Sequence, residues 1–188
     1  MKNPKKRGRD KAKQRHNLRA QTNNAMSTYA LSASFTAKDE KTPILRFGAG
    51  TTRFRIISDN FLECLSLFCK TADGKGYSKI WEASDDQPDL PAGHEYEQGR
   101  KPKRVVLFKA VTDEDPSKGQ VLCANLSCTE QILEEANEQQ GLTVCWMTAK
   151  RTGSGMQTAY RVKSEKATAY NSDWMEVADS LDYSEVIA

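Results

Sequence analysis

The feature that most constrains the fold is a series of short segments in which apolar and polar residues alternate, each bounded by turn residues. Residues 52–58 show the alternation best, because Phe54 and Ile56 fall on one face of an extended chain while Arg53 and Arg55 fall on the other. A period of two is that of a half-buried β-strand, so this segment is predicted as a strand with a basic outer face. The other segments predicted as strands are 61–69, 77–81, 105–111, 118–126, 142–151 and 156–163.

One helix is predicted among these strands. Ser127 and Glu130 have the spacing of a capping box, Cys128 and Ile132 begin an apolar stripe, and Gly141 marks the end of the helix. Several antiparallel strands with a single helix before the last two predict a mainly β fold, an OB-type five-stranded antiparallel barrel. A β-sandwich without barrel closure is the structural alternative.

Charge and composition divide the chain into three parts. Residues 1–19 hold nine Lys and Arg against one acid, and residues 171–188 hold five acids and no base, although the net charge is only +3. We assign residues 1–42 to a basic N-terminal arm and linker, 43–166 to the OB-type domain, and 167–188 to an acidic C-terminal tail. The domain carries an irregular insertion at 70–102, where Gly and Pro recur, and both tails are expected to be disordered.

Basic arms condense on phosphates, and an acidic tail can compete for the same surface. In the tail, Trp174, Val177 and Leu181 follow helical spacing between the acids, which is typical of a docking peptide. Two interpretations of the tail stay open: a docking peptide for partner proteins, or a solvated chain end.

The sequence argues against several classes of protein. It contains no run of about 18 apolar residues, so a membrane span is not expected. The first residues lack the apolar core of a secretory signal, which predicts a cytoplasmic protein, with an organelle transit peptide as the alternative. The sequence has no Gly-rich phosphate loop and no metal-binding His pair on a helix, so we do not expect an enzyme.

Five cysteines occur in this chain. Cys64 and Cys69, like Cys123 and Cys128, are separated by four residues inside or beside apolar segments. Such spacing allows a zinc site, but a buried Cys also behaves as a small apolar residue. We therefore predict core packing for the cysteines, with no metal and no cofactor.

The remaining pattern suits single-stranded nucleic acid. Proteins of that class line a groove with cations for the backbone and add aromatic rings on which bases stack. The residues predicted to bind nucleic acid are Arg53, Arg55, Tyr77, Lys79, Trp81, Arg100, Lys101, Lys103, Arg104, Lys150, Arg151 and Arg161, with Lys163 as a further cation. Phe108 and Trp146 are also candidates for stacking, but their apolar strands favour core packing, and Tyr160 is expected in the core as well.

Three segments together resemble the single-stranded DNA-binding (helix-destabilising) proteins of tailed bacteriophages. They are Phe47–Gly50 running into Thr52–Ser58, the basic run Arg100–Arg104 entering a strand with Phe108, and Trp146 through Arg151–Gly155 to Tyr160. The resemblance covers roughly residues 43–165. Some members of the family hold zinc in an insertion, but the insertion here contains no Cys.

This resemblance implies an OB-type barrel that coats single-stranded DNA during replication, recombination or repair, without catalysis, in the cytoplasm of a bacteriophage host. It implies that Arg53, Arg55, Trp81, the 100–104 run and Arg151 face the DNA. Self-association through the N-terminal arm and docking of replication or recombination proteins on the acidic tail would fit the same role. Two alternatives stay open: a non-specific RNA-binding or nucleoid-like protein that uses the basic arm, and an assembly protein whose arm and tail bind each other.

Overall fold

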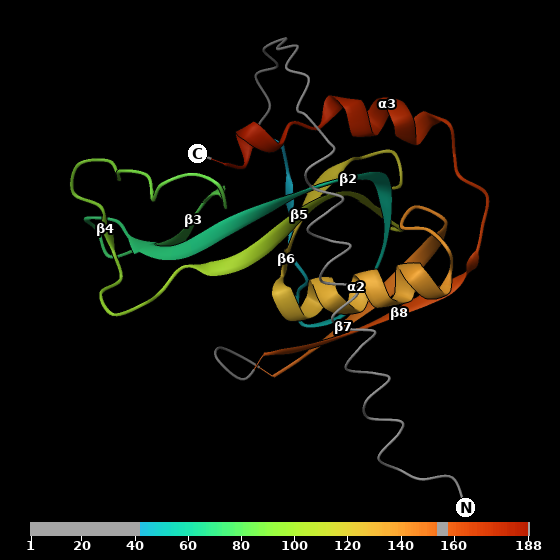
Figure 1. The fold of residues 1–188 in the computed structure, drawn as a ribbon, viewed down its shortest axis with the longest axis horizontal. Coiled ribbons are helices and arrows are strands. Elements are labelled where there is room, and N and C mark those ends of the chain that lie inside the picture. Colours follow the sequence, from blue (N-terminus) through green and yellow to red (C-terminus); the bar gives the residue numbers. More distant parts are fainter. Residues whose placement is uncertain (1–41, 154–157, 188) are drawn as a thin grey trace, which may run out of the picture. The chain divides into compact units, whose positions relative to one another are not determined.

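The computed structural model describes residues 42–153 and 158–187, and the basic arm predicted at 1–42 lies outside this part of the chain except for Thr42. The described residues form a mainly β structure, as the sequence predicts (Figure 1). Its elements are β1 (Ile44–Leu45), β2 (Gly50–Lys70), β3 (Gly76–Glu82), β4 (Glu95–Tyr96), β5 (Lys103–Thr112), β6 (Gln120–Asn125), α2 (Leu126–Glu138), β7 (Cys145–Thr152), β8 (Ala159–Ala167), α3 (Asp173–Ser180) and the 3-10 helix η2 (Tyr183–Glu185).

The strands form one mixed sheet in the order β1-β6-β5-β2-β7-β8, and β3 and β4 also pair with β2. The β1–β6 pair is parallel, and the other pairs are antiparallel. The two ends of this order, β1 and β8, make no ladder with each other in the described part of the chain, so the sheet is open there.

β2 is one strand of 21 residues, although the sequence predicts two strands at 52–58 and 61–69. Its pairing with β5 shifts register between Ile56 and Phe61, so the polar break at Asp59-Asn60 produces a β-bulge rather than a turn. The first part of β2 pairs with β7, and its last part pairs with β3 and β4 in an extension that leaves the body of the sheet (Figure 1). β2 therefore connects every part of the sheet.

The main core lies between the inner face of the sheet and α2. It contains the residues that alternation places on that face, including Phe54, Ile56, Phe108 and Met147, all with no exposed surface, together with Ile132 of α2. The alternation of β2 and the core position of Phe108 are thus confirmed.

The ends of α2 differ in detail from the prediction. The side chain of Asn125 caps the first turn by accepting a hydrogen bond of 2.9 Å from the Cys128 N–H, so the capping box predicted at Ser127 and Glu130 is wrong. At the other end Gln140 adopts φ 64°, and Gly141 N–H donates to the Ala136 carbonyl at 2.9 Å. This is a Schellman motif in which Gln140, not the predicted Gly141, takes the left-handed conformation.

α2 also covers the outer edge of β8. The amide of Gln131 donates to the Tyr160 carbonyl at 3.0 Å and accepts from the Val162 N–H at 2.9 Å. The carboxylate of Glu135 accepts from the Ser164 N–H at 2.7 Å. Two side chains of a helix therefore supply the hydrogen bonds that a neighbouring strand would otherwise make.

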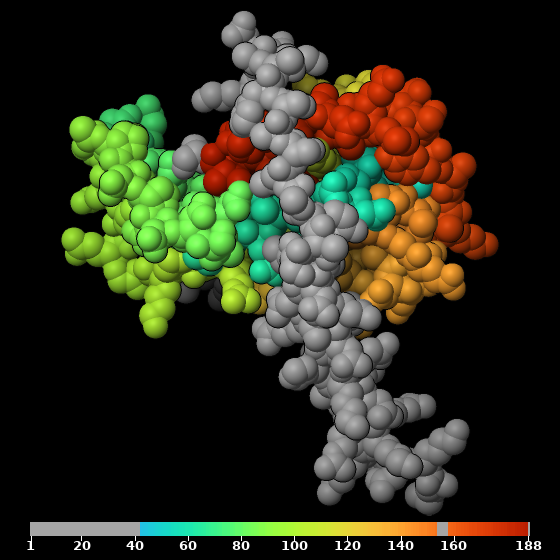
Figure 2. Space-filling model, turned by 45° about the horizontal axis from the view of Figure 1, so that its top comes forward, coloured from blue at the N-terminus to red at the C-terminus, as the bar shows by residue number. Residues whose placement is uncertain are grey.

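The C-terminal segment, residues 168–187, is ordered and covers the outer face of the sheet, so the prediction of a disordered acidic tail is wrong for these residues (Figures 1 and 2). Trp174, Leu181, Tyr183 and Val186 are buried. The strand residues that pack with them are Ile57, Val105, Leu107, Val111 and Val121. The reason is that β5 is apolar on both faces, and a strand of this kind needs cover on both sides.

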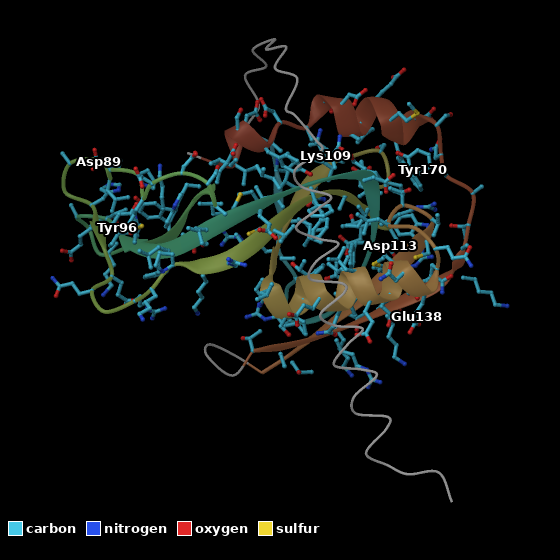
Figure 3. The ribbon with its side chains drawn as sticks, viewed as in Figure 1. Asp89, Tyr96, Lys109, Asp113, Glu138 and Tyr170 are labelled. Atoms are coloured by element: carbon cyan, nitrogen blue, oxygen red, sulfur yellow. The ribbon has the colours of Figure 1, made fainter. Side chains whose placement is uncertain are left out.

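Polar contacts fix the C-terminal segment in place. Trp174 Nε1 donates to the Pro116 carbonyl at 2.9 Å, and Glu185 accepts from the Thr42 N–H at 2.7 Å. Lys109 lies next to α3 (Figure 3). Its Nζ donates to the Ala178 carbonyl at 2.6 Å, at the end of α3, and lies 5.4 Å from the centre of the Tyr183 ring. Burial lowers the pKa of Lys109, while nearby acids of the segment act in the opposite direction. The segment is thus part of the folded body.

Candidate nucleic-acid interface

Four cations lie together on the outer side of β2, β7 and β8, and we call this group the cationic surface: Arg53, Lys150, Arg161 and Lys163. Lys150 of β7 is directly opposite Arg161 of β8, and Lys163 is opposite Thr148. Opposed residues of an antiparallel pair share one face of the sheet. β2 lies on the other side of β7, where Thr51 pairs with Lys150 and Arg53 pairs with Thr148. Thr148 therefore stands between Arg53 and Lys163, and Thr51 stands beside Lys150.

The charges of this surface are only partly compensated. Lys150, Arg161 and Lys163 are exposed, and none of them forms an ion pair with another described residue. Like charges directly opposite each other in a sheet are destabilising, by roughly 0.2–1 kcal/mol for a pair of this kind. A surface of cations and hydroxyls held on a rigid sheet has the chemistry needed to bind phosphate groups.

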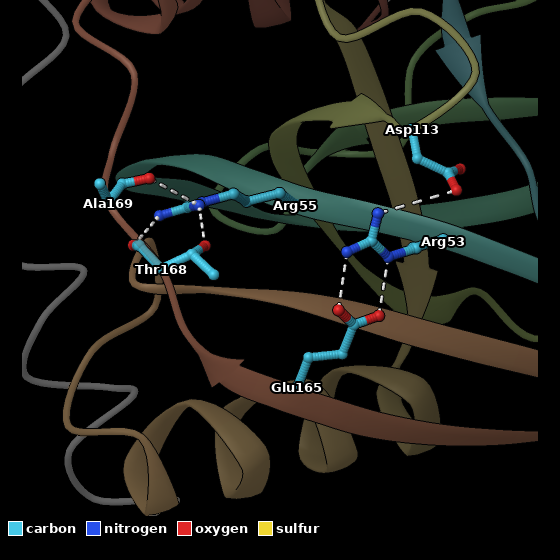
Figure 4. Close-up of polar contacts among 6 residues, drawn as sticks. All are labelled: Arg53, Arg55, Asp113, Glu165, Thr168 and Ala169. Atoms are coloured by element: carbon cyan, nitrogen blue, oxygen red, sulfur yellow. Dashed lines mark hydrogen bonds and ion pairs between the residues drawn. The ribbon is translucent and has the colours of Figure 1, made fainter.

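Arg53 is the exception, because it is held by acids. Its Nε and Nη2 each donate a hydrogen bond of 2.7 Å to the Glu165 carboxylate of β8, and Asp113 lies 3.9 Å from Nη1 (Figure 4). The fork of hydrogen bonds raises the pKa of Arg53 and lowers the pKa of Glu165. The guanidinium also lies 4.7 Å from the centre of the Trp146 ring.

Arg55 does not belong to this surface, so its prediction as an outward-facing nucleic-acid ligand is wrong. It is fully buried, and its guanidinium donates to the carbonyls of Thr143, Thr168 and Ala169 at 2.7–3.1 Å. Figure 4 shows the contacts with Thr168 and Ala169. Trp174 stacks on it, with the guanidinium carbon 4.8 Å from the ring centre. Desolvation by burial lowers the pKa of Arg55. Alternation places Arg55 correctly on the outer face, but the C-terminal segment covers that part of the face.

Trp81 is also buried, at 3% exposure, so the prediction that this ring is open for stacking is wrong for this structure. It is opposite Leu65 of β2, and Tyr96 packs against it with ring centres 6.5 Å apart. Its indole N–H has no hydrogen-bond partner in the described residues. Tyr77, half-buried on the same strand, hydrogen-bonds His94 at 3.0 Å. The insertion therefore covers the aromatic residues of β3, while Lys79 stays partly exposed.

The predicted basic run at 100–104 does not form one patch. Lys103 is opposite Ser66 and Arg104 is opposite Leu65 in β2, so strand alternation directs these two side chains to opposite faces. Arg100 pairs with Glu97 and lies over the Phe68 ring. Lys101, Lys103 and Arg104 are exposed, but nothing in the register joins them to the cationic surface.

Arg151 faces the inner side of the β7–β8 hairpin. One of its terminal nitrogens donates to the Phe47 carbonyl at 3.1 Å, and it is opposite Tyr160, whose ring is 6.0 Å from that of Phe47. Its Nε is buried without a partner in the described residues. Arg151 thus ties the segment before β2 to the hairpin, and its predicted contact with DNA stays a prediction.

Sequence reasoning missed Thr51, Thr148, Glu165 and Tyr170 as parts of this region. Tyr170 is 37% exposed and packs edge-on against Trp174, with ring centres 5.5 Å apart. Trp146 is partly exposed and also packs edge-on against Trp174, with ring centres 5.9 Å apart. An aromatic cluster therefore borders the cationic surface, and the alternation of Arg161, Lys163 and Glu165 along 159–167 was the signal that could have placed Glu165 there.

Core packing of the cysteines is confirmed, because four are buried and Cys123 is half-buried, all as free thiols. In the part of the chain that the structure describes, no group of His, Cys, Asp and Glu residues is arranged to hold a metal ion. Burial raises the pKa of Cys64 and of Cys128 to about 12.

No helix within 42–153 and 158–187 combines the length and apolar character needed to cross a membrane. No family model matches the sequence, and no curated protein or solved structure matches it either.

Proposed function

We propose that this protein binds single-stranded nucleic acid without sequence preference, with single-stranded DNA as its main ligand, and that it has no catalytic activity. The observation that carries the proposal is the pair of exposed cations Lys150 and Arg161, directly opposite each other on β7 and β8. Folding alone does not favour this arrangement, whereas a phosphate backbone lying across the two strands would.

The neighbouring groups support a single strand over a duplex. Hydroxyls of Thr51 and Thr148 stand beside the cations, and the aromatic rings of Trp146 and Tyr170 lie at the border of the surface. Bases of a single strand are free to stack on such rings, whereas bases of a duplex are not. Among the described residues, the helix that packs on this side of the sheet is α3, and its exposed face carries Asp173, Glu176 and Asp179, whose charge opposes entry into the major groove of a duplex.

We further propose that the body is an open variant of the OB barrel. β5 and β6 follow β2 as an antiparallel meander, α2 comes next, and β7 returns to pair with the start of β2 before β8. This order supports the proposal, in which the hydrogen bonds between α2 and β8 take the place of the contact that closes an OB barrel. The role in replication, recombination or repair of a bacteriophage follows from the resemblance of sequence segments alone.

Partners are proposed on the same basis. Asp173, Glu176 and Asp179 are exposed on α3, and Met175 beside them is 63% exposed, so this outer face of α3 could dock a basic protein surface. Self-association through the basic arm concerns residues outside the described part of the chain.

A competition experiment tests the proposed function. Labelled single-stranded DNA is bound to the full chain at one fixed salt concentration, and unlabelled single-stranded DNA, duplex DNA and single-stranded RNA compete for it. We expect single-stranded DNA to compete best and the affinity to fall steeply with salt. Preference for duplex or a flat salt response would contradict the proposal, and preference for RNA would favour the RNA-binding alternative.

A further inference from the structure

The acidic side chain of Glu165 lies within the cationic surface and binds Arg53 directly, while Asp113 makes a longer contact of 3.9 Å with the same guanidinium. Both oxygens of Glu165 accept hydrogen bonds of 2.7 Å from Nε and Nη2 of Arg53 (Figure 4). This two-bond fork is the geometry in which an arginine also binds a phosphate group. Glu165 therefore fills the position that a backbone phosphate would take on Arg53.

The same contact covers an aromatic ring. The Arg53 guanidinium, held by Glu165, lies over Trp146 at 4.7 Å, and the indole of Trp174 packs edge-on against Trp146 at 5.9 Å. Trp146 is the partly exposed tryptophan of this group, whereas Trp174 is buried. While Arg53 stays in this position, the ring face beneath it cannot receive a base.

The contact is also easily exchanged. The side chains of Arg53 and Glu165 are 38% and 39% exposed, so water and other anions reach both partners and solvent screens the ion pair. The other cations of the surface, Lys150 and Lys163, stand on the adjoining strands and would attract the incoming backbone.

We propose that Glu165 is an internal substitute for phosphate: in the free protein it holds Arg53 over Trp146, and a backbone phosphate of a bound single strand displaces it. With Arg53 drawn to the phosphate, a base stacks on Trp146. This inference rests on the proposed function, and it makes Arg53, Trp146 and Glu165 one nucleotide-binding unit with a built-in competitor.

The test is a double-mutant cycle with a labelled oligothymidylate as the probe. Glu165→Gln removes the charged partner of the fork and leaves Arg53 with the longer contact to Asp113, and we expect this variant to bind about two- to fivefold more tightly than the unchanged protein. Glu134→Gln, on the exposed side of α2, makes the same change of net charge and should leave affinity unchanged. In an Arg53→Gln background, Glu165→Gln should have no effect, because the arginine that it releases is absent.

Two further measurements distinguish the loss of the hydrogen-bonded fork from the loss of the negative charge of Glu165. Glu165→Asp retains the charge but is too short for the fork, so it should also tighten binding, by less than Glu165→Gln. Acrylamide quenching reports mainly Trp146, because Trp81 and Trp174 are buried, and it should increase in free Glu165→Gln and fall when oligothymidylate binds.

Each other outcome has a distinct meaning. Unchanged or weaker binding by Glu165→Gln, or equal tightening in the Arg53→Gln background, would overturn the inference. If binding is then still weakened by Lys150→Gln, the proposed function stands and only the role of Glu165 is wrong. If none of the folded proteins binds oligothymidylate, the proposed function fails and the inference fails with it.

Discussion

The hydroxyl of Tyr183 donates a hydrogen bond of 2.7 Å to the carbonyl oxygen of Asn60, in the bulge where β2 leaves its regular pairing with β5. Burial of the ring raises the pKa of this hydroxyl. Tyr183→Phe should lower the free energy of unfolding by about 0.5–1.5 kcal/mol, because the carbonyl loses its donor inside the packed segment. Urea denaturation measures the change.

Tyr170 provides the matched control. It donates to the Ile57 carbonyl at 2.6 Å in the same bulge, but its side chain is 37% exposed, so water can replace the hydroxyl. Tyr170→Phe should therefore lower the free energy of unfolding by less than Tyr183→Phe does. A larger loss for Tyr170→Phe would contradict the view that the Tyr183 end of the segment is the better packed.

Docking of the C-terminal segment should depend on Trp174. This ring is buried between Arg55 and Trp146, so Trp174→Ala should lower stability by about 3–5 kcal/mol. Met175→Ala, one position along α3 and 63% exposed, should change stability by less than about 0.5 kcal/mol. Equal effects in denaturant unfolding would mean that α3 does not pack on the sheet.

Arg53 and Arg55 should behave oppositely when substituted. Arg55→Lys cannot reach the three carbonyls that bind the guanidinium, so it should destabilise the fold by about 2–4 kcal/mol without changing the affinity of the folded protein for single-stranded DNA. Arg53→Lys should cost less than about 1 kcal/mol of stability but weaken binding. Parallel urea melts and DNA titrations test both, and the reverse pattern would place the wrong arginine in the interface.

The cations Lys150 and Arg161 should lower the stability of the fold while they strengthen the binding of nucleic acid. Lys150→Gln should raise the free energy of unfolding by about 0.2–1 kcal/mol, because it removes repulsion from Arg161. The same change should lower the slope of log affinity against log salt by about 0.7 for the lost phosphate contact. Lys118→Gln, an exposed lysine between β5 and β6, should leave the slope unchanged. Identical slopes for both variants would remove Lys150 from the proposed interface.

Buried thiols should make the fold sensitive to high pH. The pKa of Cys64 and of Cys128 is about 12, against an ordinary value of 9.0, so the folded protein keeps protons that the unfolded chain loses. Stability is then fully present below about pH 9 and falls as the pH rises toward 12. Unfolding curves between pH 8 and pH 10 measure the fall, and Cys64→Ser with Cys128→Ser should reduce its steepness. A thiol reagent should label these two residues no faster than the protein unfolds.

Strand positions followed from the sequence because alternation is a property of neighbouring side chains. Phe54 and Ile56 mark the buried face of β2 whatever the rest of the chain does, and the same pattern correctly identified the strands around Phe108 and Met147. Bends are harder to predict, since Asp59-Asn60 is equally compatible with a turn and with the bulge that the structure contains.

The errors at the candidate site have one common cause. Alternation shows which face a residue occupies but not what covers that face, and Arg55 is covered by residues more than a hundred positions later. The tail is acidic, but its buried apolar residues Trp174, Leu181 and Tyr183 determine where it lies. The unbroken apolar run 105–108 was a signal that β5 needs cover on both faces, and the C-terminal segment supplies it.

The contact between α2 and β8 depends on two lengths that are nearly equal, one turn of helix and two residues of strand. Four residues of helix, from Gln131 to Glu135, advance about 6 Å, and two residues of strand, from Val162 to Ser164, advance about 6.7 Å. The two spacings agree closely enough for the side chains of one helix face to match the free amides of a strand. Because those two amides are already bonded, the middle of β8 does not offer them to a strand of another molecule, which hinders two copies of the protein from joining their sheets at this edge.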